Sequence, residues 1–397
     1  MNRTEKTEAI AQMTEALGSA PHAFLIDFQG ISVPDVTELP PFEDGQPRPV
    51  AVIVGDTGSP AAFVANELWL QTDDDEALAD FLNATPQEVV FGQNMTSLTL
   101  HVGRALVRGW SAGDEVIVTE LDHHANADTW RALGREHGIR TRTVPMEPAS
   151  GELRWDALEA AFTRRTRLLA IGAASNALGT ITDVAAATRL AHDAGALCFV
   201  DAVHFAAHAL VDVQAIGCDF LVCSPYKFYG PHLGVLYGRR DLLERLDAPK
   251  LEPAPDHAPD RLETGTLSHE AIAGAGAAVD WLASLASGAA SRREALAATF
   301  GALHERGLAQ VTRLWEALRG VPGLTLYGPP PARPRTSTLS FAMATHASDA
   351  VARHCADRGV FVSNGDFYAT TVVRRLGHAH APRARSLRRP LDSLWQP

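Results

Sequence analysis

The sequence predicts an α/β protein built on a mostly parallel seven-stranded sheet with helices on both faces, followed by a smaller α+β domain at the carboxyl end. Three observations predict this architecture. Short apolar runs alternate with helical stretches between residues 86 and 240. The runs are continuously apolar, which is typical of strands that are buried on both faces. Beyond residue 250 the chain changes to long helical segments and then to a proline-rich break at 328–331.

Seven runs are expected to form the strands of the sheet: Glu88–Phe91, Glu115–Thr119, Thr141–Pro145, Leu168–Ala174, Ala196–Asp201, Asp219–Ser224 and Gly234–Gly238. Helical spacing of apolar residues marks the stretches between some of them, namely Thr96–Val107, Ala127–His137 and Ala185–Ala194. Strands that alternate with helices form parallel sheets, and ligands bind at the carboxyl ends of such strands. Asp201, Ser224, His123 and Asn176 end or closely follow four of the runs. We therefore expect these four side chains in one crevice.

The carboxyl-terminal third is expected to contain helices over Ala271–Ala286 and Ala290–Leu318. A small α+β unit is then predicted from two short runs and the helix between them: Thr336–Phe341, Ser348–Arg358 and Val360–Ser363. The chain is accordingly divided into a large domain over 86–250, a helical continuation over 251–320 and a small domain over 321–397. Residues 1–85 form an irregular amino-terminal segment with one expected strand, Val50–Val54.

Composition excludes several classes of protein. The formal net charge of −12 argues against a dedicated nucleic-acid binder, because phosphate contacts require clustered cations. The four cysteines show no C-x-x-C spacing, so neither a disulfide framework nor a zinc ribbon is expected. The sequence has neither the apolar core of a signal peptide at its start nor a stretch of about 18 apolar residues. We therefore expect a cytoplasmic protein that binds no nucleic acid and no membrane.

Lysine is used very sparingly, and one lysine has an unusual setting. Of the 35 basic residues only Lys6, Lys227 and Lys250 are lysines. Lys227 lies directly after an apolar run, between Tyr226 and Phe228. Lysine, unlike arginine, can lose its proton and act as a nucleophile or a base. A lysine that simply extends from a strand end to solvent would have the same local sequence.

Six segments, in this order, resemble one known family: Phe91-Gly-Gln-Asn-Met-Thr96, Asp122-His-His-Ala-Asn126, Ser175-Asn-Ala-Leu-Gly-Thr180, Val200-Asp-Ala-Val-His204, Cys223-Ser-Pro-Tyr-Lys-Phe-Tyr-Gly-Pro231 and Glu263-Thr-Gly-Thr266. The family is the class V aminotransferase branch of the fold-type I pyridoxal phosphate (PLP) enzymes, which contains the cysteine desulfurases. The resemblance is strong over 86–275 and thinner over 336–376, and residues 1–85 match poorly. It implies a PLP-binding large domain and an amino-acid substrate.

The resemblance assigns three catalytic residues. Lys227 would form the Schiff base with the cofactor aldehyde and then exchange the proton at the substrate Cα. Asp201 would pair with the pyridine nitrogen of the cofactor and keep it protonated. His123 matches the histidine that stacks on the cofactor ring.

The resemblance also assigns residues that bind the remainder of the cofactor. Asn176 and His204 would contact its ring oxygen, and Asn176 would also lie near the substrate. The phosphate would be held at a helix start, where free amides and the helix dipole favour an anion. The residues implied there are Asn94, Met95, Thr96, Ser224 and Tyr226, and Thr266 would reach the phosphate of the neighbouring subunit. The resemblance thus implies a homodimer.

The chain departs from the family pattern in two places. Desulfurases carry a nucleophilic cysteine on a loop of the small domain, whereas the matching stretch Ser363–Ala369 contains none, and Cys355 lies on the preceding helix. Without this cysteine, the loop has no thiolate that could accept the substrate sulfur and form a persulfide. The carboxyl-terminal tail over 377–397 is also atypical, and either Arg383 or Arg385 would bind the substrate carboxylate. We expect β-elimination, as in a C–S lyase; transamination and a non-catalytic PLP-binding homologue remain alternatives.

Two further interpretations carry less weight. Asp56-Thr57-Gly58-Ser59 resembles the loop of an aspartic protease, but such enzymes need a second aspartate and an all-β fold. A turn after Val54 is the simpler interpretation. His123, His124, His204 and His208 would suit zinc, but no carboxylate or cysteine completes a recognisable metal signature. We therefore expect no metal.

Overall fold

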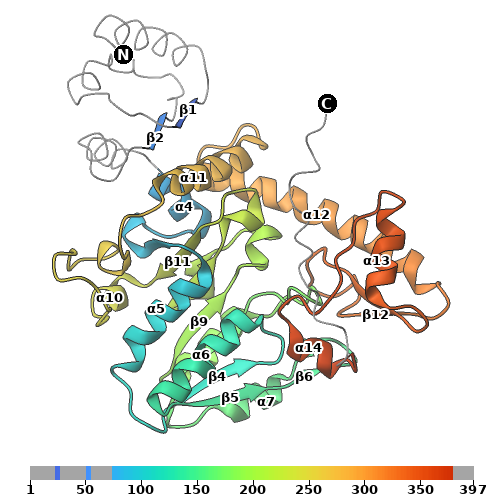
Figure 1. The fold of residues 1–397 in the computed structure, drawn as a ribbon, viewed down its shortest axis with the longest axis horizontal. Coiled ribbons are helices and arrows are strands. Elements are labelled where there is room, and N and C mark those ends of the chain that lie inside the picture. The colour runs from blue at the N-terminus through green and yellow to red at the C-terminus, as the bar shows by residue number, and fades with distance from the viewer. Residues whose placement is uncertain (1–22, 27–50, 55–73, 379–397) are drawn as a thin grey trace, which may run out of the picture.

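A computed structural model describes residues 23–26, 51–54 and 74–378 of the chain, and it contains the expected central sheet (Figure 1). The strands lie in the order β3 (Val89–Gly92), β11 (Gly234–Gly238), β10 (Phe220–Cys223), β9 (Leu197–Asp201), β8 (Thr166–Gly172), β4 (Glu115–Thr119) and β5 (Arg140–Val144). β11 runs antiparallel to both of its neighbours, and the other strand pairs are parallel. The mostly parallel seven-stranded sheet is thus confirmed.

Helices cover both faces of the sheet because successive strand residues point to opposite sides. In β4, Val116 and Val118 join one apolar cluster, while Ile117 joins the other. The cluster of Val116 and Val118 is closed by α5 (Met95–Val107), α6 (His124–His137) and α10 (Arg240–Leu243). The cluster of Ile117 is closed by α4 (Asp74–Leu82), α7 (Trp155–Ala161), α8 (Val184–Asp193), α11 (His269–Ser284) and α12 (Arg292–Arg319).

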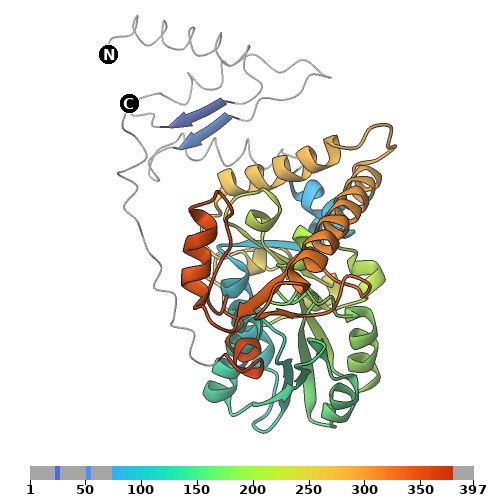
Figure 2. The same ribbon diagram turned by 90° about the vertical axis from the view of Figure 1, so that its right-hand side faces the viewer.

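The carboxyl-terminal part forms a smaller group of elements beside the carboxyl edge of the sheet. The long helix α12 leads from α11 towards this group, as both views show (Figures 1 and 2). β12 (Leu324–Tyr327) pairs antiparallel with β13 (Ser340–Met343), and α13 (Ser348–Ala356) and α14 (Thr370–Arg375) follow. α14 is joined to the large domain by an ion pair of 2.9 Å between Arg375 and Glu120.

Short elements complete the described part of the chain. The hairpin β6 (Met146–Glu147) and β7 (Glu152–Leu153) follows β5, and α9 (Val213–Ile216) precedes β10. β1 (Ala23–Ile26) and β2 (Ala51–Val54) pair in parallel. None of the helices in this part of the chain is long and apolar enough to cross a membrane.

Two expected strands of the small domain are wrong as predicted. Val360–Ser363 forms no strand, because no strand of the described residues lies beside it and its side chains are exposed, Phe361 by 86%. The strand expected over Thr336–Phe341 begins only at Ser340, because the backbone before it turns to pack against the large domain, where the Thr336 amide donates a hydrogen bond to the Gly179 carbonyl.

The domain boundaries stay a prediction. The Asp56–Ser59 turn and the tail arginines lie outside the described residues.

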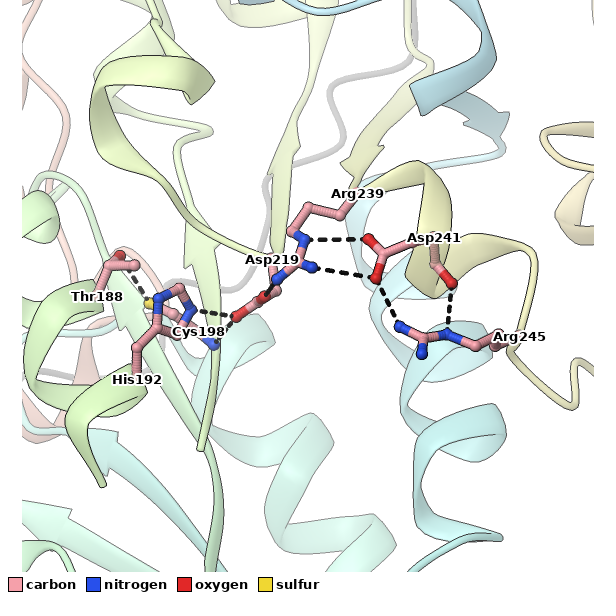
Figure 3. A network of polar contacts seen from close by, with 7 residues as sticks. All are labelled: Thr188, His192, Cys198, Asp219, Arg239, Asp241 and Arg245. Atoms are coloured by element: carbon pink, nitrogen blue, oxygen red, sulfur yellow. Dashed lines mark hydrogen bonds and ion pairs between the residues drawn. The ribbon is translucent and has the colours of Figure 1, made fainter. Parts of the chain in front are cut away.

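A buried carboxylate links neighbouring strands at the amino-terminal ends of the parallel strands (Figure 3). Asp219, just before β10, is 0% exposed. It accepts a hydrogen bond of 2.8 Å from the Cys198 amide at the start of β9, and its second oxygen is 2.9 Å from Arg239 at the end of β11. His192 of α8 lies 2.8 Å from the same carboxylate. One side chain thus joins three strands and a helix.

We predict that Asp219→Ala destabilises the protein by about 2–3 kcal/mol, because it leaves the buried Cys198 amide without an acceptor. Urea unfolding followed by circular dichroism would measure the loss. Asp241→Ala is the matched control, since Asp241 also pairs with Arg239 but is 48% exposed. An exposed ion pair contributes less than about 1 kcal/mol. Equal losses in the two variants would contradict the structural role given to Asp219.

Candidate active site

Lys227 lies on a single 3₁₀ turn, Pro225–Phe228, that directly follows β10. The turn is fixed on its buried side by Phe228, which is 1% exposed and stacks on Phe81 with ring centroids 4.4 Å apart. Tyr229 ends the turn in the left-handed region at φ 71°. The Lys227 side chain is exposed, and its Nζ lies 5.2 Å from the centre of the Tyr226 ring. Lys227 is therefore held on a rigid base with its amine accessible.

Asp201 is placed beside Lys227 by parallel strand pairing. It ends β9, where it lies opposite Gly172 of β8 and Val222 of β10. Burial raises the pKa of the Asp201 carboxyl to about 6, against the opposing effects of the Val203 amide, which donates a hydrogen bond, and of the Lys227 charge. A nearby cationic group would stabilise the charged form of a carboxylate held in this way.

His123 forms the amino-terminal cap of α6. Its Nδ1 accepts a hydrogen bond of 3.1 Å from the Ala125 amide. Burial, together with the smaller effects of the Lys227 and His124 charges, lowers the pKa of His123 to about 4. The ring is therefore neutral at neutral pH. The turn before it is fixed by Asp122, which accepts hydrogen bonds from the amides of Thr119 and Gly172.

His204 is also kept neutral, and two threonines orient it. Its Nε2 lies 2.9 Å from Thr338 Oγ1 and 3.3 Å from Thr336 Oγ1. Burial, together with the charges of His208 and Lys227, lowers the pKa of His204 to about 3. The threonines are fixed by Arg335, which is 2% exposed and donates hydrogen bonds to the carbonyls of both.

Asn176 has one amide atom bonded and one free. Its Nδ2 donates a hydrogen bond of 2.9 Å to the Phe367 carbonyl. Its Oδ1 is buried and has no hydrogen-bond partner in the described part of the chain. Buried polar atoms are nearly always bonded in folded proteins. This oxygen is thus available to a donor that the described residues do not supply.

The start of α5 has the features of an anion site. Asn94 caps the helix by accepting a 2.9 Å hydrogen bond from the Ser97 amide, which leaves the amides of Met95 and Thr96 at the first turn. Gly234 at the start of β11 packs against this loop so closely that a Cβ would lie 2.4 Å from the Asn94 carbonyl carbon. Only glycine therefore permits this approach. Ser224, buried at the end of β10, completes the group of candidate phosphate residues.

The structure brings most of the expected residues together. The charge of Lys227 acts on Asp201, His123, His204 and also His208, which the sequence analysis considered only as a zinc ligand. Thr266 is exposed, and no contact with the Lys227 cluster is found for it in the described residues. Among these residues no group of three histidine, cysteine or acidic side chains could hold a metal ion. Arg383 and Arg385 lie outside the described residues.

Sequence reasoning missed the partners that the small domain supplies. Thr338 and Phe367 are separated from His204 and Asn176 by 134 and 191 positions. Neither belongs to a motif, and the Phe367 contact is made by a backbone carbonyl, which any residue provides. No local signal in the sequence could therefore have identified these contacts.

The sequence and the fold are both similar to those of known proteins. The sequence model of the family "Aminotransferase class-V" matches residues 71–388. The chain is 37% identical over 318 residues to a cysteine desulfurase of Klebsiella pneumoniae (strain 342), covering 75% of this chain and 73% of the relative. It is 33% identical to a cysteine desulfurase of Pectobacterium atrosepticum, with coverage of 76% and 74%.

Solved structures show the same fold. The crystal structure of the cysteine desulfurase CsdA from Escherichia coli superposes with a TM-score of 0.69 at 28% identity, over 82% of this chain and 80% of that one. The apo structure of a cysteine desulfurase from Thermococcus onnurineus gives a TM-score of 0.71 at 24% identity, over 81% and 79%. The latter likeness concerns the fold alone.

Glu263 opens the last of the six family-like segments, and it is a partly buried acid. Its Oε1 accepts a 2.8 Å hydrogen bond from the Phe91 amide. The pKa of Glu263 is raised to about 8, mainly by burial and to a smaller extent by the charges of Asp75 and Asp260. The hydrogen bond from the Phe91 amide acts in the opposite direction. The folded protein therefore binds this proton more tightly than the unfolded chain does.

We predict that Glu263→Gln stabilises the protein increasingly as pH rises. Glu263 ionises near pH 4.5 when unfolded but near pH 8 when folded, so the wild type loses stability across this window and the loss levels off above it. Glutamine keeps the acceptor oxygen and does not ionise. Thermal unfolding between about pH 5 and pH 8.5 would show a widening gap in Tm. The exposed Glu270→Gln is the control, and a gap that is independent of pH would contradict the burial effect.

Proposed function

Because the chain belongs to the class V aminotransferase family, we propose that it is a PLP-dependent, cysteine desulfurase-like enzyme that cleaves a carbon–sulfur bond of an amino acid by β-elimination. The family expected from the six sequence segments is confirmed by the family match. The observation that carries the proposal is the cluster around Lys227, in which an accessible amine adjoins a buried carboxylate and neutral imidazoles.

The residues of the site fit PLP. The buried Asn176 Oδ1 lacks a donor in the described part of the chain, and the start of α5 leaves two amides for an anion. Lys227 would hold the cofactor covalently, and Asp201 would pair with its ring nitrogen. The other residues proposed to hold it are His123 on the ring face, Asn176 and His204 at the ring oxygen, and Met95, Thr96, Ser224 and Tyr226 with the Asn94 loop around the phosphate. When bound, PLP accepts the electron pair that remains at the substrate Cα after proton loss.

The chain's own residues supply the proton transfer and the orientation. Lys227 would take the proton from the substrate Cα. Electrons of the Cα–H bond form a Cα–Cβ double bond as the Cβ–S bond breaks, and the sulfur leaves with its bonding pair and takes up a proton. With water the net change is R–S–CH₂–CH(NH₃⁺)–COO⁻ + H₂O → R–SH + pyruvate + NH₄⁺, which is balanced and involves no oxidant.

The cysteines explain why sulfur should leave as a free thiol or sulfide. Cys198, Cys218 and Cys223 are at most 1% exposed, and burial raises the pKa of each, to about 12 for Cys198 and Cys223. A buried thiol that does not ionise is a poor acceptor of sulfur. Cys355 lies on α13, away from the Ser363–Ala369 loop in sequence. The proposed reaction therefore ends without a protein persulfide.

A homodimer is part of the proposal. Thr266 is exposed on the segment before α11, as required of a residue that reaches the cofactor phosphate of a second subunit. Tyr229, at the end of the Lys227 turn, and Trp281, in the last turn of α11, form an exposed edge-to-face pair with ring centroids 5.2 Å apart. Exposed aromatic side chains of this kind are typical of interfaces. The cytoplasmic location stays a prediction.

We predict that Lys227→Ala abolishes covalent attachment of PLP and lowers the rate of product formation by about 10²–10⁴-fold, the usual contribution of a general base. Borohydride reduction followed by peptide mass spectrometry would locate the attached cofactor. Lys250→Ala is the matched control, because Lys250 bonds only the nearby Ala254 carbonyl and Asp256 in the described residues. Cofactor attached to a lysine other than Lys227 would contradict the site assignment.

We predict that Cys355→Ser releases sulfide from cysteine at the wild-type rate, because no cysteine of the chain is proposed to accept sulfur. Sulfide and pyruvate would be quantified in the absence of added thiol, and intact mass would test for a protein-bound sulfur atom. A strong loss of activity, or a persulfide on the wild type, would instead assign Cys355 as an acceptor. Formation of a sulfur-containing keto acid would indicate transamination.

A further inference from the structure

The segment that lacks the cysteine has a distinctive backbone. Phe367 and Tyr368 are consecutive non-glycine residues in the left-handed region, at φ 53° and 56°. Bulky residues rarely adopt this conformation, and they retain it only where the surroundings enforce it. We refer to Asp366–Ala369 as the aromatic turn. Its backbone is thus held in place rather than relaxed.

Hydrogen bonds from two sources enforce the aromatic turn. Within it, the carboxylate of Asp366 accepts from the Tyr368 amide at 3.2 Å and from Thr370 Oγ1 at 2.8 Å. From the large domain, Asn176 Nδ2 donates to the Phe367 carbonyl at 2.9 Å, and the His124 amide donates to the Tyr368 carbonyl at 2.8 Å. Two of the donors, Asn176 and His124, therefore belong to segments after β8 and β4 that also carry candidate active-site residues.

The turn places its aromatic rings at that site. The Tyr368 ring lies 5.5 Å from the His123 ring, centroid to centroid, at an angle of 32°. His123 is in turn within reach of the Lys227 charge. Tyr368 is 73% exposed and Phe367 is 37% exposed, so much of their apolar surface is not covered by the chain. A strained turn that holds uncovered rings beside a reactive centre requires a functional explanation.

We propose that Tyr368, supported by Phe367, forms one wall of the pocket for the substrate side chain and selects amino acids whose leaving sulfur carries an aromatic or large apolar group over cysteine itself. This inference rests on the proposed function and adds the substrate class. Cysteine offers only a thiol, which would leave the rings uncovered. An S-substituted cysteine brings an apolar group that the rings can cover, with aromatic pairs in offset or edge-to-face contact.

The same proposal accounts for the missing thiol. A loop cysteine serves a reaction that retains the sulfur atom on the protein, and the site of that residue is occupied here by aromatic side chains. When the sulfur carries a carbon substituent, elimination releases a thiol R–SH, from which no sulfur atom can pass to the protein without breaking a second C–S bond. A substrate of this kind therefore requires a surface that binds the carbon substituent R on its sulfur, and the rings of Tyr368 and Phe367 provide one.

The test compares binding and turnover of cysteine and S-benzylcysteine by the PLP-loaded protein. Tyr368→Asn removes the ring but suits the left-handed backbone, because asparagine tolerates that region; Tyr368→Phe keeps the ring. Phe361→Ala is the control, since Phe361 is 86% exposed but lies outside the aromatic turn. Dissociation constants come from the change in cofactor absorption on titration, and kcat/KM from pyruvate release.

We expect the wild type, Tyr368→Phe and Phe361→Ala to prefer S-benzylcysteine, and Tyr368→Asn to lose about tenfold or more of that preference in both measurements. A preference that survives Tyr368→Asn, or a wild type that binds cysteine equally well, overturns the proposal. So does a Tyr368→Asn variant that changes oligomeric state, since the ring would then serve an interface. A protein that binds PLP but no amino acid overturns the proposed function instead.

Discussion

The parallel pairing of β8, β9 and β10 is the constraint on which the rest of the site depends. Its register sets Asp201 opposite Gly172 and Val222. The carboxylate thus lies at the same edge as the turn that carries Lys227. Because parallel strands need covering helices, this pairing also buries the edge from both faces. Burial in turn lowers the pKa of the nearby histidines, so strand register, burial and charge state follow from one another.

The second half of the site is added by the small domain, largely through backbone groups. Two carbonyls of the aromatic turn accept hydrogen bonds from Asn176 and His124, and Thr338 orients His204. The large domain therefore supplies the ionisable side chains, and the small domain fixes their orientation. The bonds from Asn176 and His124 reach backbone carbonyls, so they do not depend on the side chains of Phe367 and Tyr368.

The sheet was predictable because its strands are continuously apolar and well separated by helical stretches. The family-like segments around Lys227 and Asp201 were predictable for a related reason, since each is local in sequence. The prediction failed at Val360–Ser363, where an apolar run has no strand to pair with and stays exposed. It also could not reach the contact between Asn176 and Phe367, which depends on how two domains pack. Local patterns thus determine the elements, and long-range packing completes the site.

Polar residues at the two ends of the parallel strands differ in how completely they are hydrogen-bonded. At the amino edge, Asp219 is buried with every bond satisfied by neighbours on two strands and a helix. At the carboxyl edge, burial raises the pKa of Asp201 to about 6, and the Asn176 oxygen has no hydrogen-bond partner among the described residues. Each of these features disfavours the folded chain on its own. A sheet can tolerate such an edge when the opposite edge is fixed, because the strands connect the two rigidly. The polar network at the amino edge is therefore best understood as the structural support that permits an incompletely satisfied, ligand-ready edge at the other end.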